Sequence, residues 1–114
     1  MSDCLFCKIG SGQIPAKVVL QDDEVLAFDD VNPQAPVHVL VIPKRHVAAL
    51  NEAGAGDQAL LGRLLEAAAL VARKKGIAEA GYRVVANTGR DGGQTVFHLH
   101  LHVLGGRPMA WPPG

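Results

Sequence analysis

Histidine and apolar residues alternate strictly near the end of the chain. The histidines are His98, His100 and His102, and the apolar residues are Leu99, Leu101 and Val103. Successive side chains of a β-strand point to opposite faces of a sheet, so the three imidazoles would share one face. The pattern predicts a strand over residues 96–104 that buries its apolar face in a core and presents histidines on the other face.

Four further segments have the composition of strands. Residues 17–20 and 25–28 flank a short acidic turn, which predicts a β-hairpin. A third strand is expected over residues 37–42, where Pro43 stops the apolar run, and a fourth over residues 82–86. Residues 105–114 are rich in proline and are expected to form neither strand nor helix.

One long amphipathic helix is expected from about Asp57 to Lys75. Apolar residues recur there with helical spacing, at Leu60, Leu61, Leu64, Leu65, Ala68, Val71 and Ala72. Asp57 is a candidate N-cap, and Gly76 is suited to the left-handed position that ends a helix. The 114 residues therefore predict a single α+β domain over 1–114, a five-stranded antiparallel meander with one main helix packed on one face.

Charge and hydropathy exclude several classes of protein. Eleven basic and eleven acidic residues give a net charge of zero, which disfavours nonspecific binding to nucleic acid or to anionic membranes. No apolar run approaches the roughly 18 residues that span a bilayer, and the first residues do not resemble a signal peptide. A cytoplasmic protein is expected.

Clustered imidazoles suit either metal binding or nucleophilic and acid–base chemistry near neutral pH. The histidine segment follows a glycine-rich loop, residues 87–95, whose N–H groups could cradle a phosphate. His38 would reach the same face if its strand pairs with the histidine strand, although a solvated side chain is the simpler alternative. The chain has no P-loop sequence and no acidic cluster for Mg²⁺, so attack by a histidine on phosphorus is favoured.

Cys4 and Cys7 are the only cysteines and are separated by two residues. This spacing is found both in redox pairs and in half of a metal site. A structural disulfide is disfavoured in the cytosol.

The chain resembles the histidine-triad (HIT) superfamily, and within it the HINT branch of nucleotide-binding proteins. The resemblance rests on HLHLHVL at 98–104, CLFCKI at 4–9, IPAK at 14–17, NPQAP at 32–36, IPKRH at 42–46, DGGQTVF at 91–97, and the tail from GGR at 105–107 to WPPG at 111–114. It implies an α+β fold with a short N-terminal helix, in which two protomers join their sheets as a homodimer. It also implies a purine nucleoside phosphoramidase, which cleaves the P–N bond of adenosine 5′-phosphoramidates.

The same resemblance implies roles for the histidines. His100 would be the nucleophile that forms a nucleotidyl-histidine, which water then hydrolyses. His102 and His38 would contact phosphate and transfer protons, and which of them is the acid stays open. His98, the first histidine of the triad, is included among the catalytic candidates.

The resemblance also implies a nucleotide site. Asp30 would bind the ribose, with a turn residue as the simpler alternative. The phosphate and leaving group would be lined by Asn87, Gly93, Gln94 and Thr95. The base would lie among Phe6, Ile9, Phe28, Val31 and Leu40, each of which would otherwise be taken as core. Trp111 would reach the neighbouring protomer's site.

Some HIT members carry the cysteine pair and bind zinc. The resemblance therefore implies a structural zinc held by Cys4, Cys7, His46 and His98, with no cofactor required for catalysis. Two reduced thiols and a surface His46 are the alternative. Thr95, Val31 and Ala110 depart from residues common in the family, which affects the expected substrate preference and not the reaction type.

Two other functions compete with the phosphoramidase. One is hydrolysis of diadenosine polyphosphates, the activity of another HIT branch. The other is a nucleotide-binding scaffold or regulator whose hydrolysis is incidental.

Overall fold

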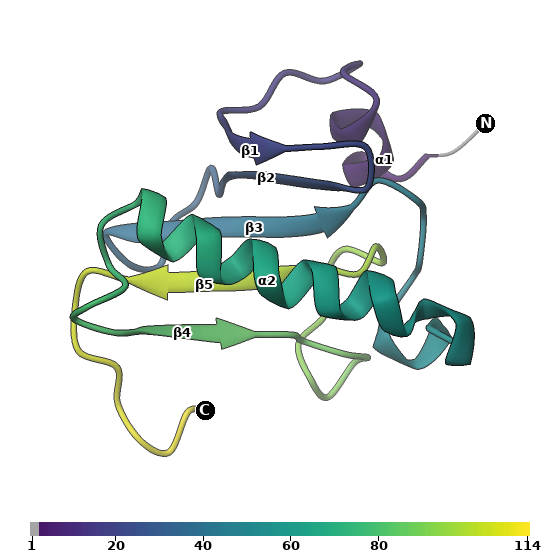
Figure 1. Cartoon of the computed structure of the whole chain (residues 1–114). Coiled ribbons are helices and arrows are strands. Elements are labelled where there is room, and N and C mark those ends of the chain that lie inside the picture. The colour runs from purple at the N-terminus through teal and green to yellow at the C-terminus, as the bar shows by residue number, and fades with distance from the viewer. Residues whose placement is uncertain (1–2) are drawn as a thin grey trace.

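The computed structural model describes residues 3–114. These residues form five strands and two α-helices, which are labelled in Figure 1. In chain order they are α1 (Leu5–Gly10), β1 (Val18–Gln21), β2 (Val25–Asp29), β3 (Val37–Pro43), α2 (Gln58–Lys74), β4 (Tyr82–Val85) and β5 (Leu101–Gly105). Two 3₁₀ turns, Leu50–Glu52 and Ala55–Asp57, precede α2 and were not expected from the sequence. The predicted α+β class, main helix and short N-terminal helix are confirmed.

All strands pair antiparallel in one sheet of order β1-β2-β3-β5-β4. The first three strands follow the predicted meander, and the turn residue Asp22 accepts hydrogen bonds from the main-chain N–H groups of Glu24 and Val25. The predicted meander is wrong for the last two strands, because β5 lies between β3 and β4. Helix α2 crosses the sheet between β3 and β4 in the chain, so β4 forms the edge strand and β5 pairs with both β3 and β4 (Figure 1).

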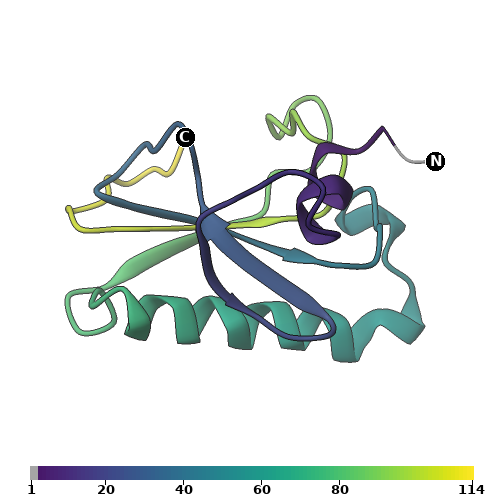
Figure 2. The ribbon, with the colours of Figure 1, turned by 90° about the horizontal axis from the view of Figure 1, so that it is seen from above.

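Helix α2 covers one face of the sheet (Figure 2). Its buried residues Leu64, Ala68 and Val71 pack in one core with alternate strand residues, Leu101 and Val103 among them. Gly76 has φ +76°, as expected of the residue that ends the helix. Leu65 was expected on the buried face but is 59% exposed.

Asp57 occupies the N-cap position of α2, but its carboxylate does not cap this helix. It accepts a hydrogen bond from the Gly54 N–H at 2.8 Å and contacts the Arg45 guanidinium. The carboxylate is therefore used by the preceding 3₁₀ turn, which the helical periodicity did not indicate.

The strand predicted over residues 96–104 begins only at Leu101. In the register of β3 and β5, Leu99 would lie opposite Pro43, which has no N–H to donate. The Leu99 N–H instead bonds to the Val47 carbonyl oxygen at 2.6 Å. The alternation of faces still persists through this irregular segment, because Leu99 is buried in the α2-side core together with Leu101.

No helix within residues 3–114 is both long enough and apolar enough to cross a membrane.

Candidate active site

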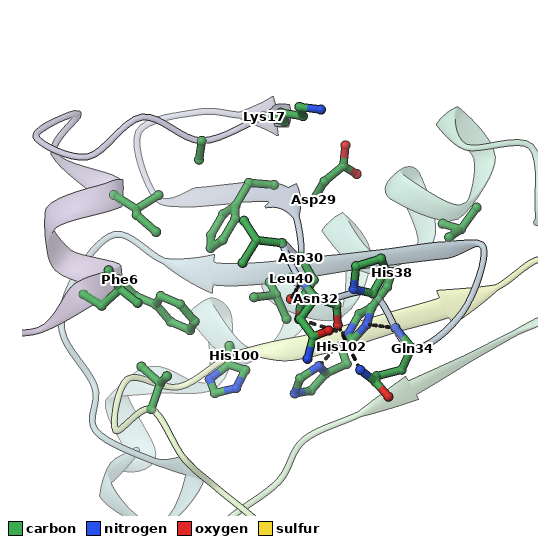
Figure 3. A pocket seen from close by; sticks show the side chains of 18 of the residues that line it. Phe6, Lys17, Asp29, Asp30, Asn32, Gln34, His38, Leu40, His100 and His102 are labelled. Carbon is green, nitrogen blue, oxygen red and sulfur yellow. Dashed lines mark hydrogen bonds and ion pairs between the residues drawn. The ribbon is translucent and has the colours of Figure 1, made fainter.

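A cavity of about 1150 Å³ opens on the sheet face opposite α2. The predicted site residues that line it are Phe6, Ile9, Phe28, Asp30, Val31, His38, Leu40, Thr95, His100 and His102. They come from α1, from β2 and the loop that follows it, from β3, from the glycine-rich loop and from the histidine segment, and Figure 3 labels Phe6, Asp30, His38, Leu40, His100 and His102 among them. Residues far apart in the sequence thus meet at one place.

One half of the cavity is apolar. Phe6, Phe28 and Leu40 belong to a second core cluster on this face, and the rings of Phe6 and Phe28 meet edge to face with centroids 5.6 Å apart. Val31, predicted with this group, is fully exposed at the mouth of the cavity. The same side chains therefore serve as core and as cavity wall, so the two interpretations made from the sequence are compatible.

His100 has a defined tautomer. Its Nδ1 lies 2.6 Å from the main-chain oxygen of His98, and a carbonyl oxygen can only accept, so Nδ1 carries the proton. The Phe6 ring stands perpendicular to the His100 ring at 5.1 Å between centroids and restricts its rotation. The remaining ring nitrogen, Nε2, has the lone pair that a nucleophile requires.

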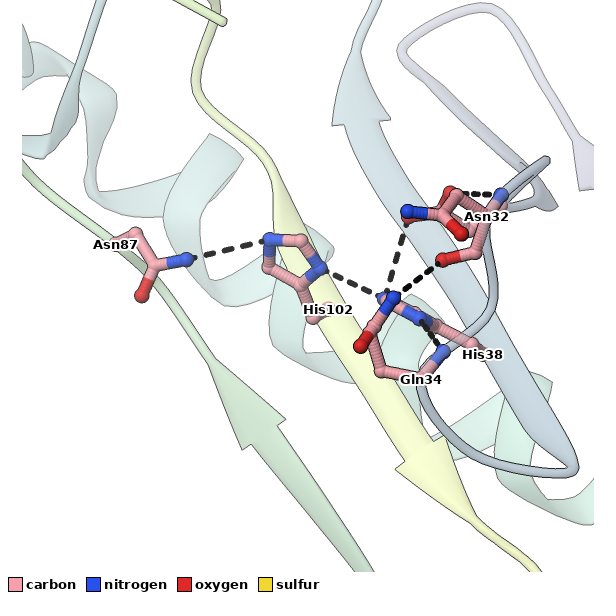
Figure 4. Close-up of polar contacts among 6 residues, drawn as sticks. Asn32, Gln34, His38, Asn87 and His102 are labelled. Atoms are coloured by element: carbon pink, nitrogen blue, oxygen red, sulfur yellow. Dashed lines mark hydrogen bonds and ion pairs between the residues drawn. The ribbon is translucent and has the colours of Figure 1, made fainter. Parts of the chain in front are cut away.

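His38 and His102 form a hydrogen-bonded pair (Figure 4). The Gln34 main-chain N–H donates to His38 Nδ1 at 3.0 Å, which places the proton of neutral His38 on Nε2. His38 Nε2 then donates to His102 Nδ1 at 2.8 Å, and neutral His102 carries its proton on Nε2. The pair therefore presents an N–H donor at its His102 end. The predicted cross-strand reach of His38 is confirmed.

Both members of this pair are neutral at neutral pH. Burial lowers the pKa of His38, and the Asp30 carboxylate opposes the shift. Burial, with the neighbouring His100 and His38 imidazoles, lowers the pKa of His102 to about 4. Each ring of the neutral pair therefore carries one proton, and the one on His102 Nε2 is not used within the pair.

Asp30 lies at the entrance to the histidine pair. One carboxylate oxygen, Oδ2, is 3.4 Å from His38 Nε2, and the other accepts the Asn32 N–H at 2.8 Å. Asp30 is therefore a turn residue, and it also faces the cavity with the oxygen that a ribose hydroxyl would need.

The glycine-rich loop is folded back on itself. Gly89 and Gly93 have φ values of +73° and +79°, in the left-handed region that favours glycine. The buried Gln94 holds the loop, because its Oε1 accepts the Gly89 N–H while its Nε2 donates to the carbonyl oxygens of Ala48 and Val96. All polar atoms of the Gln94 side chain are thus engaged within the protein.

Four predicted nucleotide-site residues do not line the cavity: Asn87, Gly93, Gln94 and Trp111. Asn87 lies beside it, with its side-chain nitrogen 3.5 Å from His102 Nε2; because both nitrogens carry protons, this is a contact and not a hydrogen bond. Trp111 is 82% exposed in a tail that Arg83 holds at the Ala110 carbonyl oxygen. A contact between Trp111 and a neighbouring protomer stays a prediction.

His98 is separated from the catalytic histidines and does not line the cavity. Its ring is completely buried, and Nε2 donates to the Pro43 carbonyl oxygen at 2.7 Å. Nδ1 faces Cys4 Sγ at 3.2 Å, Cys7 Sγ at 3.5 Å and His46 Nδ1 at 3.2 Å. Both ring nitrogens of His98 have partners away from the cavity. His98 was included among the catalytic candidates, and the structure corrects this, because neither nitrogen can reach a substrate there.

The cluster of Cys4, Cys7, His46 and His98 fits a zinc ion. Its four ligand atoms lie within 4.8 Å of one another. In a tetrahedral zinc site, bonds of about 2.0 Å to nitrogen and 2.3 Å to sulfur separate two nitrogens by about 3.3 Å and a nitrogen from a sulfur by about 3.5 Å. The observed separations of 3.2–3.5 Å match both values. The Pro43 contact leaves the lone pair of His98 Nδ1 directed into the cluster.

A second group, Asp30, His38 and His102, also has metal-binding side chains close together. It does not fit a metal. The two ring nitrogens are only 2.8 Å apart, and the Gln34 N–H keeps a proton on the His38 nitrogen that would have to bind. This group is a proton-transfer pair and not a metal centre.

The family model described as the HIT domain matches residues 11–109. The chain belongs to the HIT family. A protein from Escherichia coli strain K12 named purine nucleoside phosphoramidase is 48% identical over 94% of this chain and 90% of its own length. An uncharacterised HIT-like protein from Synechococcus elongatus is 59% identical over 98% of this chain and 97% of its own length.

Solved HIT structures share the fold. A HIT family hydrolase from Legionella pneumophila superposes with a TM-score of 0.96 at 53% identity, covering 98% of this chain and all of that one. A histidine triad nucleotide-binding protein from Candida albicans gives a TM-score of 0.83 at 31% identity, covering 96% and 83% of the two chains. The resemblance drawn from the motifs is thus confirmed at the level of the family.

Sequence reasoning missed one participant in the site of this HIT protein. The Gln34 main-chain N–H determines which nitrogen of His38 is protonated. A main-chain group leaves no signature in residue identity. The only available signal was the pair of prolines, Pro33 and Pro36, that restricts the loop just before His38.

Proposed function

We propose that this HIT protein is a nucleotide hydrolase that cleaves the P–N bond of purine nucleoside 5′-phosphoramidates through a covalent nucleotidyl-histidine at His100. The observation that carries the proposal is the complementary protonation of two neighbouring cavity residues. His100 offers a lone pair at Nε2, while the His38–His102 pair offers a proton at His102 Nε2. A P–N bond requires both, because an amine leaves phosphorus only after protonation.

The first step follows from these positions. His100 Nε2 attacks the α-phosphorus, the P–N bond breaks, and the leaving nitrogen takes the proton of His102 Nε2. The His38–His102 pair takes up a replacement proton from solvent, since neither neutral ring has a second proton to give, and His38 Nε2 keeps its hydrogen bond to His102 Nδ1 at 2.8 Å. The nucleotidyl-imidazole of His100 keeps its Nδ1–H on the His98 carbonyl oxygen, which stabilises the positive charge that the ring acquires.

In the second step water attacks phosphorus, the bond to His100 Nε2 breaks, and the proton lost by water is released to solvent, which balances the proton taken up in the first step. The products are a nucleoside monophosphate and a regenerated neutral His100. Dividing the reaction in two allows one imidazole to replace the amine before water enters.

The rest of the cavity suits a purine ribonucleotide. The apolar wall of Phe6, Phe28 and Leu40 is proposed to hold the base, and the Asp30 carboxylate the ribose hydroxyls. Thr95 lines the cavity at the end of the glycine-rich loop and is proposed to bind the phosphate.

Steady-state turnover of three ligands tests the proposal: adenosine 5′-phosphoramidate, guanosine 5′-phosphoramidate and diadenosine polyphosphate. We expect rapid hydrolysis of the phosphoramidates and slow hydrolysis of the dinucleotide. Faster hydrolysis of the dinucleotide would favour a polyphosphate hydrolase. Tight binding of adenosine monophosphate without turnover of any ligand would favour a nucleotide-binding scaffold.

We further propose that Cys4, Cys7, His46 and His98 bind one structural zinc. The match of their separations to tetrahedral coordination supports this. The ion would join α1 to the segment that precedes the nucleophile, and α1 carries Phe6, which packs on His100. Metal analysis of protein purified without chelator tests it, with one zinc per chain expected.

A further inference from the structure

The segment that follows β5 packs against the loop that precedes His38. Gly106 has φ +91°, and a Cβ at this position would lie 2.8 Å from the Pro36 Cβ, so a side chain here would displace the loop. The next residue, Arg107, donates from Nη2 to the Gln34 carbonyl oxygen at 3.1 Å. Figure 2 shows the tail and the loop between β2 and β3 at the same end of the molecule.

Gln34 is held through both of its main-chain polar groups. Its carbonyl oxygen accepts from Arg107, and its N–H donates to His38 Nδ1 at 3.0 Å. Its side-chain Nε2 donates to the Asn32 carbonyl oxygen at 3.0 Å, which fixes the loop from within (Figure 4). The orientation of one N–H therefore depends on a guanidinium in the C-terminal tail.

We propose that Arg107 is a positioning residue, which holds Gln34 so that its N–H keeps the proton of His38 on Nε2, toward His102. The contacts form a continuous series from Arg107 to Gln34, His38 and His102, with separations of 3.1, 3.0 and 2.8 Å. Arg107 does not line the cavity, so it acts only through the loop.

The kinetic consequence rests on the proposed function. If the His38 proton moves to Nδ1, His38 Nε2 accepts from His102 Nδ1, so neutral His102 has no proton on Nε2 for the leaving nitrogen and kcat falls. Substrate binding depends on other residues, so KM should stay within about twofold. Loss of one solvent-exposed hydrogen bond, such as that from the Arg107 guanidinium, changes an equilibrium roughly two- to tenfold, and we expect kcat of Arg107→Leu to fall by a similar factor.

The direct test is the tautomer of His38 in substrate-free protein labelled with ¹⁵N-histidine at pH 7. The protonated and unprotonated nitrogens of neutral imidazole have widely separated ¹⁵N shifts, and the His38→Gln spectrum assigns the signals. In the parent protein we expect protonated Nε2 and unprotonated Nδ1. In Arg107→Leu the two signals should move toward each other, and in Arg107→Lys, which keeps a cationic donor, they should move less.

Arg83→Leu is the matched control, because Arg83 also donates to a main-chain oxygen of the tail but at Ala110, away from the loop. The His38 signals should be unchanged in it. The proposal is overturned if Arg107→Leu keeps the parent His38 signals, or if Arg83→Leu moves them as far. Since the measurement needs no substrate, a shifted tautomer without phosphoramidate turnover would support the positioning role and count against the proposed function.

Discussion

His38 Nε2 lies 2.8 Å from His102 Nδ1, although 64 residues separate them in the chain. The contact exists because β3 and β5 pair antiparallel with His38 opposite Leu104 and His102 opposite Leu40, so the two imidazoles are diagonal neighbours on one face. The register of β3 and β5 therefore brings the two imidazoles into hydrogen-bond contact, so the protonation of one ring depends on that of the other. The catalytic proposal depends on this pair and on the separately oriented His100.

Replacement of the nucleophile should stop turnover and leave binding intact. In His100→Ala we expect kcat for adenosine 5′-phosphoramidate to fall by about a thousandfold or more, a barrier increase of about 4 kcal/mol, because the covalent route is lost. Calorimetric binding of adenosine monophosphate should change little, since the proposed base and ribose contacts lie on other residues. Residual activity within about tenfold of the parent would show that His100 is not the nucleophile.

Zinc loss should lower stability more than activity. Cys4 also caps α1, where its sulfur accepts the Cys7 N–H at 3.4 Å. Serine keeps a capping group but is a poor zinc ligand, so Cys4→Ser tests the metal separately from the cap. We expect loss of zinc, a fall in Tm of roughly 5–10 °C and retention of much of the turnover.

His46→Ala is the companion variant, because His46 is exposed and its Nδ1 faces Cys7 and His98 of the proposed zinc site. It should lose zinc in parallel with Cys4→Ser. Protein that contains no zinc as purified, or an unchanged zinc content and Tm in His46→Ala, would remove the metal from the account.

Acid should destabilise the fold through His102. Its pKa of about 4 in the folded chain lies below the usual histidine pKa of about 6.5, so the unfolded chain binds more protons between these pH values. The free energy of unfolding should therefore fall as the pH decreases from about 6.5 to 4, by at most about 3 kcal/mol from this residue. Urea denaturation at several pH values measures the slope.

The slope should be shallower in His102→Gln, which cannot titrate in this range. The absolute stability of the variant will also differ, because the hydrogen bond from His38 is lost, so only the slopes are compared. Parallel curves for the parent and the variant would show that His102 is not the residue whose pKa is depressed.

We propose that the protein is a homodimer, because the described chain exposes apolar side chains and an unpaired strand edge. Leu65 and Leu70 of α2 are 59% and 40% exposed, and β4 is an edge strand of the sheet. Sedimentation at micromolar concentration should give about twice the 12.0 kDa mass of one chain. Deletion of residues 108–114, which include the exposed Trp111, should alter leaving-group preference more than folding. A species of single-chain mass would contradict the dimer.

The sequence predicted the elements whose signals are local. The period of two in residues 98–103 identified the histidine face, and the helical period identified α2. The start of β5 could not be predicted, because it depends on Pro43 opposite Leu99 and on the competing Val47 carbonyl oxygen, both distant in sequence. The same is true of Asp57, whose carboxylate is taken by the 3₁₀ turn that precedes α2.

For the candidate site, the sequence predicted which residues take part but not how their side chains are protonated. The motifs named the histidines, and the structure adds their tautomers. His98 Nε2 on Pro43, His100 Nδ1 on the His98 carbonyl oxygen and His38 Nδ1 on the Gln34 N–H are all contacts to main-chain groups. Main-chain groups are common to every residue, so no residue identity in the sequence indicates which nitrogen they will meet.

Trapping the covalent intermediate tests the central claim most directly. The protein is mixed with excess adenosine 5′-phosphoramidate, denatured within milliseconds at alkaline pH, where the P–N bond survives, and analysed by intact mass and peptide fragmentation. We predict one adenylyl group per chain, located on His100 and absent from His100→Ala. Steady turnover with no adenylylated protein at any time, or an adenylyl group on another residue, would contradict the account.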